Sequence, residues 1–206
     1  NLIKENNLQD KPVRVKFSVF RKEGGLYTPE VKDIEYFILT SEIEHSFYTL
    51  NEDFYEVELF KDHYINAGLL STIKTNNKAV NVLGGIFARE NNYHNCLLVN
   101  EKKSVVEALN GNLFLVKGDR IKTPPLTDGA LNGITRKQLV NMIKKLQEYN
   151  FEEVSISPFE LQKADELFIT NVIVGIQPIS KYRKKEYTNT VAKDLLAKLN
   201  AKARLG

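Results

Sequence analysis

The sequence predicts a mixed α/β fold of the α+β kind, with short strands and helices following one another along 206 residues. Two patterns predict it. From Val13 to Val19 apolar and polar residues alternate with a period of two, which is typical of a half-buried strand. From Thr135 to Tyr149 apolar residues instead recur at helical spacing and predict an amphipathic helix. A chain of this length has room for one large or two small domains.

The first part of the chain is predicted to consist of strands and loops. The apolar face of the first strand comprises Val13, Val15, Phe17 and Val19. Gly24-Gly25 marks a loop. Further strands are predicted over 34–39 and 55–60, and the polar, aromatic stretch 41–54 between them is the candidate domain boundary.

A helix is predicted over 77–91, with Leu83, Ile86 and Phe87 on its buried face. Gly84-Gly85 inside it costs about 1 kcal/mol per residue relative to alanine. The pair would therefore suit the close approach of another backbone. A β meander then follows over 96–99, from 104 onward, over 112–116 and over 121–124.

The last part of the chain alternates helices and strands. Thr135 and Gln138 form a T-x-x-Q capping box for the helix over 135–149, whose buried stripe comprises Leu139, Met142, Ile143 and Leu146. Ser157-Pro158 begins a short helix to Lys163. Strands are predicted over 154–157 and 167–173, and a basic amphipathic helix over 188–205 with Val191, Leu195 and Leu199 inward.

Composition is that of an ordinary globular protein, with 42% hydrophobic and 27% charged residues. No apolar run is long enough for a membrane span, and no signal peptide is visible. A net charge of +3 is too small to argue for nucleic acid. The three histidines lack metal-ligand spacing, and the single cysteine, Cys96, fits a reducing compartment. We expect a cytoplasmic protein without a metal, nucleic-acid or membrane partner.

Lys74 ends the apolar run that starts at Ala67 and precedes the helix predicted over 77–91. A lysine held there can be desolvated, and burial disfavours the charged amine, so that it becomes nucleophilic near neutral pH. A Schiff base with a carbonyl cofactor requires such an amine. The alternative is a lysine whose ammonium group simply reaches water.

Four segments occur in a characteristic order: Ile-Lys-Thr-Asn-Asn at 73–77, Val105–Phe114, Thr123–Arg136 and Asp165–Ile179. Together they resemble the class IV aminotransferase family, the pyridoxal-phosphate enzymes of fold type IV. That family includes D-amino-acid and branched-chain aminotransferases and 4-amino-4-deoxychorismate lyase. The resemblance extends from about Arg14 to the C-terminus. It implies pyridoxal 5'-phosphate as the cofactor and a small amino compound as the substrate.

The resemblance implies a role for Lys74 as the Schiff-base lysine, which also moves protons on and off the substrate carbons. Lys78 and Lys61 are the alternatives. Glu107 occupies the position of the glutamate that faces the pyridine nitrogen; a carboxylate there keeps that nitrogen protonated. The alternative for Glu107 is a solvated residue at a strand end.

The phosphate cup implied by the resemblance has two arms. The first is the helix start at 133–136, where the amides of Ile134 and Thr135 bind phosphate, as the free N–H groups of a helix start can do. The second is a turn at Asn171 and Val172. Relatives often carry a hydroxyl residue at the position of Val172, so only a backbone contact is expected there. Arg21 matches an arginine that holds a substrate carboxylate, with a plain surface arginine as the equal alternative.

The resemblance also implies the domain organisation. Residues 1–48 would be the end of a small N-terminal α/β domain, and residues 49–206 a larger C-terminal pseudo-barrel α/β domain that binds the cofactor. Family members begin with a further segment carrying a phosphate-binding arginine, and no candidate for it precedes Arg14. We therefore expect a fragment, a processed chain or a sequence given without its first segment. The resemblance further implies a homodimer with the site near the subunit interface.

Two reactions stay open. The run Thr170–Ile179 favours 4-amino-4-deoxychorismate lyase, which eliminates pyruvate and leaves 4-aminobenzoate, because lyase-type sequences carry Thr-Asn and Gly-Ile-x-Pro here. An aminotransferase of the D-amino-acid or branched-chain type, passing an amino group to a 2-oxo acid, is the alternative. A non-catalytic relic of the family that serves binding is a third possibility.

Overall fold

The computed structural model describes residues 1–205, which divide into a small unit, Asn1–Phe47, and a larger unit from Tyr48 onward. In the small unit, helix α1 (Leu2–Glu5) precedes strands β1 (Val13–Arg21) and β2 (Ile34–Glu42). The two strands pair antiparallel, with Phe17 opposite Ile38. Whether this unit is the end of a larger N-terminal domain stays a prediction.

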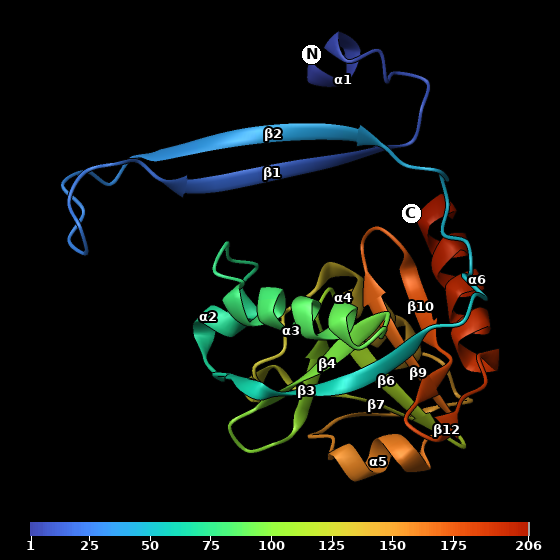
Figure 1. Ribbon diagram of the computed structural model, residues 1–206. Helices are drawn as coiled ribbons and strands as arrows, with labels where there is room; N and C mark the ends of the chain where they lie inside the picture. The colour runs from blue at the N-terminus through green and yellow to red at the C-terminus, as the bar shows by residue number, and fades with distance from the viewer. Residues whose placement is uncertain (206) are drawn as a thin grey trace. The chain divides into compact units, whose positions relative to one another are not determined.

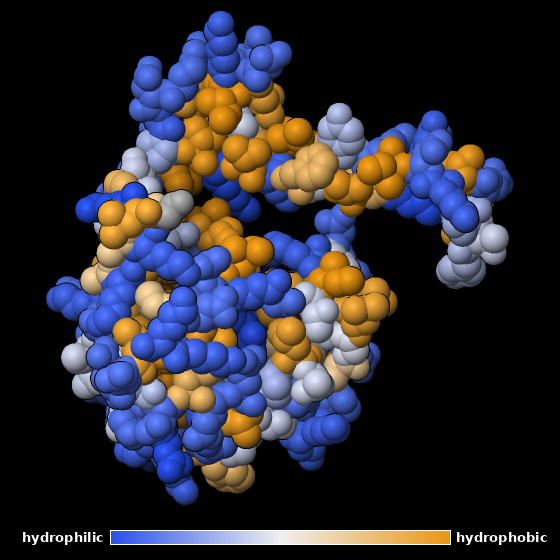
Figure 2. Space-filling view, turned by 180° about the vertical axis from the view of Figure 1, so that it is seen from behind, coloured by the Kyte–Doolittle hydropathy of each residue, from blue (hydrophilic) through white to orange (hydrophobic). Residues whose placement is uncertain are grey.

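The strand predicted at Val13–Val19 exists, but its apolar face is not half-buried. Val15 and Phe17 are 53% and 59% exposed. The reason is that the unit contains no second layer of its own over this face of the two-stranded sheet. Figure 2 shows the resulting hydrophobic side chains along the hairpin.

The larger unit is built on a mixed ten-stranded sheet whose main path runs β10-β9-β6-β5-β4-β3-β11-β12, with β7 paired to β6 and β8 paired to β7 (Figure 1). Its strands are β3 (Glu56–Ile65), β4 (Asn95–Asn100), β5 (Val105–Ala108), β6 (Gly111–Lys117), β7 (Arg120–Thr123), β8 (Asn150–Glu153), β9 (Glu166–Asn171), β10 (Gly175–Ile179), β11 (Lys181–Tyr182) and β12 (Lys185–Glu186). Its helices are α2 (Leu69–Thr72), α3 (Ala79–Glu90), η1 (Leu126–Asp128), α4 (Ile134–Ile143), α5 (Pro158–Lys163) and α6 (Thr190–Leu205).

Three apolar clusters hold the larger unit together. One, which includes Leu59, Val99 and Leu161, lies between the sheet and α5. A second packs α4 and α6 against β6 and β9, where Phe114 and Phe168 stack with ring centroids 5.1 Å apart. The third lies under α3 and contains Cys96. Helices α3 and α5 cover opposite sides of the sheet (Figure 1). The predicted meander is confirmed as β4 to β7.

Two predicted helices differ from the structure. In α3 the buried residues are Gly84 and Ala88, whereas Leu83 and Ile86 are 41% and 39% exposed. The small residues bring the helix close to the sheet: a Cβ on Gly84 would lie 2.7 Å from a methyl carbon of Leu109, so a side chain and not a backbone makes the close approach. Gly85 has nothing within 4 Å of the corresponding position.

Helix α4 ends at Ile143 rather than Tyr149, and the predicted capping box is wrong. The N-cap is Gly133, so Thr135 already lies inside the first turn, and the Gln138 side chain accepts a hydrogen bond from Lys202 instead. The helix start predicted at Ser157-Pro158 is confirmed: Ser157 is the N-cap of α5, and its N–H donates to the Glu160 carboxylate at 3.0 Å. The helix predicted over 188–205 begins at Thr190.

The strand predicted over 154–157 lies four residues earlier, as β8. Parallel pairing with β7, from Arg120–Asn150 to Thr123–Glu153, selects that register, and only Ile156 forms an isolated bridge to Val105. The strand predicted over 167–173 ends at Asn171. The Asn171 side chain accepts hydrogen bonds from the N–H groups of Ile173 and Val174, which turns the chain toward β10.

Candidate functional site

A pocket of about 280 Å³ opens in the larger unit beside α3 and the start of α4. All six residues predicted to hold the cofactor line it, namely Lys74, Glu107, Ile134, Thr135, Asn171 and Val172. They come from the loop before α3, from β5, from the first turn of α4 and from the turn after β9. The fold thus brings four distant segments to one cavity, while the role of each residue stays a prediction.

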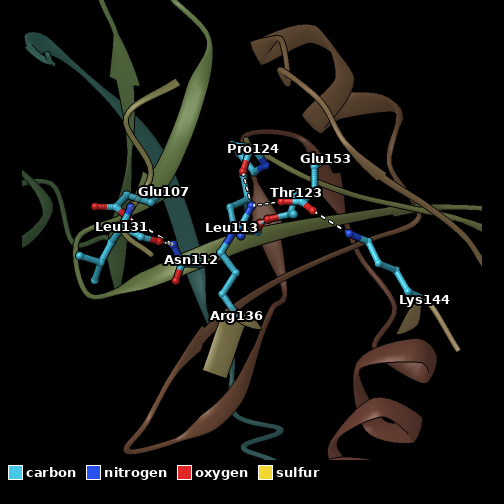
Figure 3. Close-up of polar contacts among 9 residues, drawn as sticks. All are labelled: Glu107, Asn112, Leu113, Thr123, Pro124, Leu131, Arg136, Lys144 and Glu153. Carbon is cyan, nitrogen blue, oxygen red and sulfur yellow. Dashed lines mark hydrogen bonds and ion pairs between the residues drawn. The ribbon is translucent and has the colours of Figure 1, made fainter. Parts of the chain in front are cut away.

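Glu107 lines this pocket and is only 6% exposed. Its Oε2 accepts hydrogen bonds from the Leu131 N–H at 2.9 Å and from Asn112 Nδ2 at 3.4 Å (Figure 3). Among the described residues Oε1 has no donor. Burial raises the pKa of Glu107, an effect that the Leu131 hydrogen bond and the charges of Lys78 and Lys74 oppose. One oxygen is therefore fixed by the fold, and the other is left to meet a ligand.

Strand register explains why these polar groups share one face. Glu107 lies opposite Asn112 in the β5–β6 pair, and Asn112 lies opposite Thr170 in the β6–β9 pair. Residues directly opposite one another in antiparallel strands project to the same side. All three are buried, at 6%, 4% and 1% exposure, and together they form a polar row across otherwise apolar strands.

The start of α4 forms another wall. The backbone N–H groups of its first turn have no acceptor within the helix, which suits an anion. Gly133 precedes this turn, and a Cβ there would lie 2.2 Å from Asn112 Oδ1, so only glycine lets the helix start approach β6 this closely. Behind the wall, Arg136 is buried and donates to the Pro124 carbonyl and the Glu153 carboxylate, each at 2.9 Å (Figure 3).

The turn after β9 closes the pocket on the remaining side. Because Asn171 Oδ1 is occupied by its own turn, the side chain fixes the backbone there. Tyr48 donates from its hydroxyl to the Val172 carbonyl at 3.2 Å, which holds the turn from behind. The Val172 side chain is 55% exposed and offers no polar atom, so a ligand could meet only its backbone.

Lys74 lies at the pocket but is exposed, so the expectation of a desolvated amine is wrong for this chain. The apolar run before it does not cover it, because the run folds into the short helix α2, whose Leu69 and Leu70 are 77% and 74% exposed. Lys78, the N-cap of α3, lines the same pocket and is less exposed. Both lysines remain candidates by position.

Two other predicted residues lie elsewhere. Lys61 lines a different cavity, which removes it as an alternative to Lys74. Arg21 ends β1 in the small unit, where its guanidinium donates to the carbonyls of Gly24 and Gly25. The pocket is lined by residues of the larger unit alone, so the substrate-binding role of Arg21 stays a prediction.

Sequence reasoning assigned no supporting role to the side chain of Asn112, to the backbone of Leu131 or to the missing side chain of Gly133. Asn112 was visible as a polar residue at the start of an apolar strand, which is a position that a buried strand seldom gives to an amide. Leu131 acts through its backbone N–H, and Gly133 through its lack of a side chain. Neither leaves a signal in a single sequence.

Comparisons with known proteins give the family. The family model for amino-transferase class IV matches residues 1–182. A Methanocaldococcus jannaschii protein, provisionally named a branched-chain-amino-acid aminotransferase, is 31% identical over 129 residues, which are 61% of this chain and 44% of that protein. The chain thus spans less than half the length of this curated relative.

Solved structures agree on the fold. A Legionella pneumophila protein, provisionally named a 4-amino-4-deoxychorismate lyase, superposes with a TM-score of 0.82 at 21% identity and covers 97% of this chain and 72% of its own. An aminotransferase from Brucella abortus bound to pyridoxal phosphate superposes with a TM-score of 0.78 at 19% identity. The superposition covers 97% of this chain and 74% of the Brucella chain. The predicted fold type is confirmed, and pyridoxal phosphate is the cofactor of this group of enzymes. This chain belongs to the class IV aminotransferase family.

Proposed function

We propose that the protein is a pyridoxal-phosphate enzyme acting on a small amino compound, with Lys74 as the point of covalent attachment. The observation that supports this most strongly is the pocket that collects Lys74, Glu107, the start of α4 and the Asn171–Val172 turn. An amine, a buried acid and a bed of free amide groups are the three features that hold such a cofactor by its aldehyde, its ring nitrogen and its phosphate.

The residues present fit the group. Oε1 of Glu107, which has no donor among the described residues, would accept a hydrogen bond from the protonated ring nitrogen. The amides of Ile134 and Thr135 would bind the phosphate, with the backbone at Val172 as the second arm. When bound, the cofactor supplies an electron sink for a carbanion beside the amino group. Lys74 would remove and return the proton at the substrate carbon.

For the reaction, we propose transfer of the amino group of a branched-chain amino acid to a 2-oxo acid. The 31% identity to the named branched-chain relative supports this choice. The second candidate is the lyase reaction on 4-amino-4-deoxychorismate. It is favoured by the Thr170-Asn171 and Gly175-Ile176-x-Pro178 pattern, and the likeness to the Legionella structure supports only the fold.

Borohydride reduction followed by peptide mapping tests the attachment site. We expect a pyridoxyl group on Lys74, and we expect Lys74→Ala, but not the matched Lys78→Ala, to abolish the label. Both lysines line the pocket, so the pair separates covalent attachment from simple loss of a positive charge. A label on Lys78, or no label on protein incubated with the cofactor, would contradict the proposal.

Substrate assays separate the two reactions. The aminotransferase consumes a 2-oxo acid in step with the amino acid, whereas the lyase releases pyruvate from 4-amino-4-deoxychorismate without an acceptor. Turnover of leucine with 2-oxoglutarate, and none of 4-amino-4-deoxychorismate, is expected. Pyruvate release without an acceptor would transfer the assignment to the lyase.

We also propose a homodimer. Exposed apolar side chains of the larger unit gather on α2 and α3 next to the pocket, including Leu69, Leu70 and Val82 at 77%, 74% and 61% exposure. A second copy that covered them would also shield Lys74. Light scattering on the purified protein tests this, and a monomer at high protein concentration would contradict it.

No helix within residues 1–205 has the length and apolar character needed to cross a membrane.

A further inference from the structure

A second pocket, of about 430 Å³, lies on the other side of the sheet. Its walls include Leu59 and Val99, which belong to the apolar cluster beneath α5. The first pocket includes Lys78 and Asn81 of the α3 region, and α3 and α5 lie on opposite sides of the sheet (Figure 1). The two pockets share no residue. A volume of this size is within the usual range for a small-molecule site.

The charged side chains that line the second pocket are all positive. Lys61, Lys103 and Arg183 line it, and no aspartate or glutamate of the described chain does. Glu58 neutralises one of these cations, since Arg183 Nε lies 3.3 Å from each of its carboxylate oxygens. The two lysines form no ion pair within residues 1–205. A bound anion would therefore find two unpaired positive charges and a guanidinium.

Contacts within the protein fix both the backbone and the guanidinium of Arg183 in the absence of a ligand. Its backbone lies in the left-handed region, with φ of 56°, in the tight turn between β11 and β12. Its guanidinium packs over the Tyr182 ring at 5.0 Å and is anchored through Nε by Glu58. The terminal nitrogens have no hydrogen-bond partner in the described chain, so they are available for the bidentate pairing that suits a carboxylate.

Lys103 is also carried by a rigid support. It ends the turn after β4, with φ of 63°, and its N–H donates to the Asn100 carbonyl at 2.8 Å. Asn100 is 1% exposed, and its side-chain oxygen accepts from the N–H groups of Lys102 and Ser104. The turn therefore fixes the backbone from which the ammonium group reaches the pocket.

The remaining walls are apolar and aromatic except for the Gln162 side chain. Phe159 and Pro158 come from the first turn of α5, which Ser157 and Glu160 cap, and Tyr64 comes from the end of β3. Phe159 is 76% exposed, so its ring is open to contact with a ligand. An aromatic ring would cover it while its acid group met the cations. We propose that this pocket binds a small aromatic carboxylate at a site separate from the cofactor pocket.

Benzoate, with its neutral isostere benzamide, is the probe for a titration followed by ligand-observed NMR on the protein loaded with pyridoxal phosphate. The variants are Lys61→Gln and Lys103→Gln. Lys102→Gln is the matched control, because Lys102 neighbours Lys103 in the same turn but does not line the pocket. Melting temperatures equal to wild type show that the exposed substitutions leave the fold intact.

We expect benzoate to bind, and each lining variant to weaken it about three- to fivefold, which is the effect of one partly exposed charge. Lys102→Gln should bind like wild type, benzamide should bind at least about tenfold more weakly, and high salt should weaken benzoate. Equal binding of benzoate and benzamide would overturn the proposal. So would benzoate binding that Lys61→Gln and Lys103→Gln leave unchanged, or an absence of benzoate binding.

Discussion

Replacing Gly133 by alanine is the sharpest test of how the pocket proposed for the cofactor is built. The backbone at Gly133 has φ of −65° and ψ of 142°, which alanine adopts without strain, so any effect is steric. The added Cβ would lie 2.2 Å from Asn112 Oδ1. Either the helix start moves away, or Asn112 turns and loses its 2.8 Å hydrogen bond to the Leu131 carbonyl.

The cost follows from these two options. Overpacking, or the loss of one buried hydrogen bond, costs about 1–3 kcal/mol. Alanine also reduces the conformational entropy of the unfolded chain, which stabilises the folded state by about 0.4–1 kcal/mol and offsets part of this cost. The net loss is between about 0 and 2.6 kcal/mol, and its midpoint of about 1.3 kcal/mol lowers the melting temperature of a chain of this size by about 3–5 °C. Since the same displacement moves the first-turn amides and Glu107, cofactor affinity should fall on the order of tenfold.

Thermal unfolding by circular dichroism, without cofactor, and an absorbance titration with pyridoxal phosphate measure the two effects. Gly85→Ala is the control, because it lies inside α3 with open space around the new Cβ. That variant should gain about 0.5–1 kcal/mol and keep wild-type cofactor affinity. If Gly133→Ala melted at or above the wild-type temperature and bound the cofactor equally well, the reasoning would be refuted.

Three further predictions concern titratable groups. Burial raises the pKa of Glu107, so the ionised carboxylate destabilises the folded protein above the folded-state pKa. Glu107→Gln should therefore raise the melting temperature of the cofactor-free protein at pH 8 but leave it unchanged at pH 4. The same substitution should slow catalysis. Partial burial by itself would raise the pKa of Glu153. Hydrogen bonds from Lys144 and Arg136 outweigh it, so the pKa of Glu153 is lowered. Glu153→Gln should therefore cost about 1 kcal/mol at pH 7, after allowance for its partial exposure, and the deficit should vanish below the folded-state pKa. Burial, aided by Glu58, raises the pKa of Cys96 to about 12; a thiol reagent should modify it only in denaturant.

The sequence made the pocket's chemical groups visible because they are side chains in recognisable runs. Glu107 stands in an apolar strand, and the Gly133–Arg136 run precedes a periodic helix. The T-x-x-Q pattern predicts an N-cap at Thr135, two residues later than the observed Gly133, because a glycine cap has no side-chain signature. Strand β8 was misplaced because its register is set by a partner thirty residues away in sequence, which local alternation cannot reveal.

The exposure of Lys74 was beyond sequence reasoning for a different reason. An apolar run predicts burial only where another layer covers it. Here Leu69 and Leu70 form one helical turn whose side chains point to solvent within this chain.

Asn112 links the parts of the pocket that sequence reasoning found separately. Its amide nitrogen lies 3.4 Å from the Glu107 carboxylate and 2.8 Å from the Leu131 carbonyl, while its oxygen abuts the position where Gly133 lacks a Cβ. Leu131 in turn donates to Glu107 at 2.9 Å. A movement of the start of α4 must therefore displace Glu107, because the Asn112 amide contacts both. The acid that would match the ring and the amides that would match the phosphate are thus held at one fixed spacing, which a rigid ring with a short anionic arm requires.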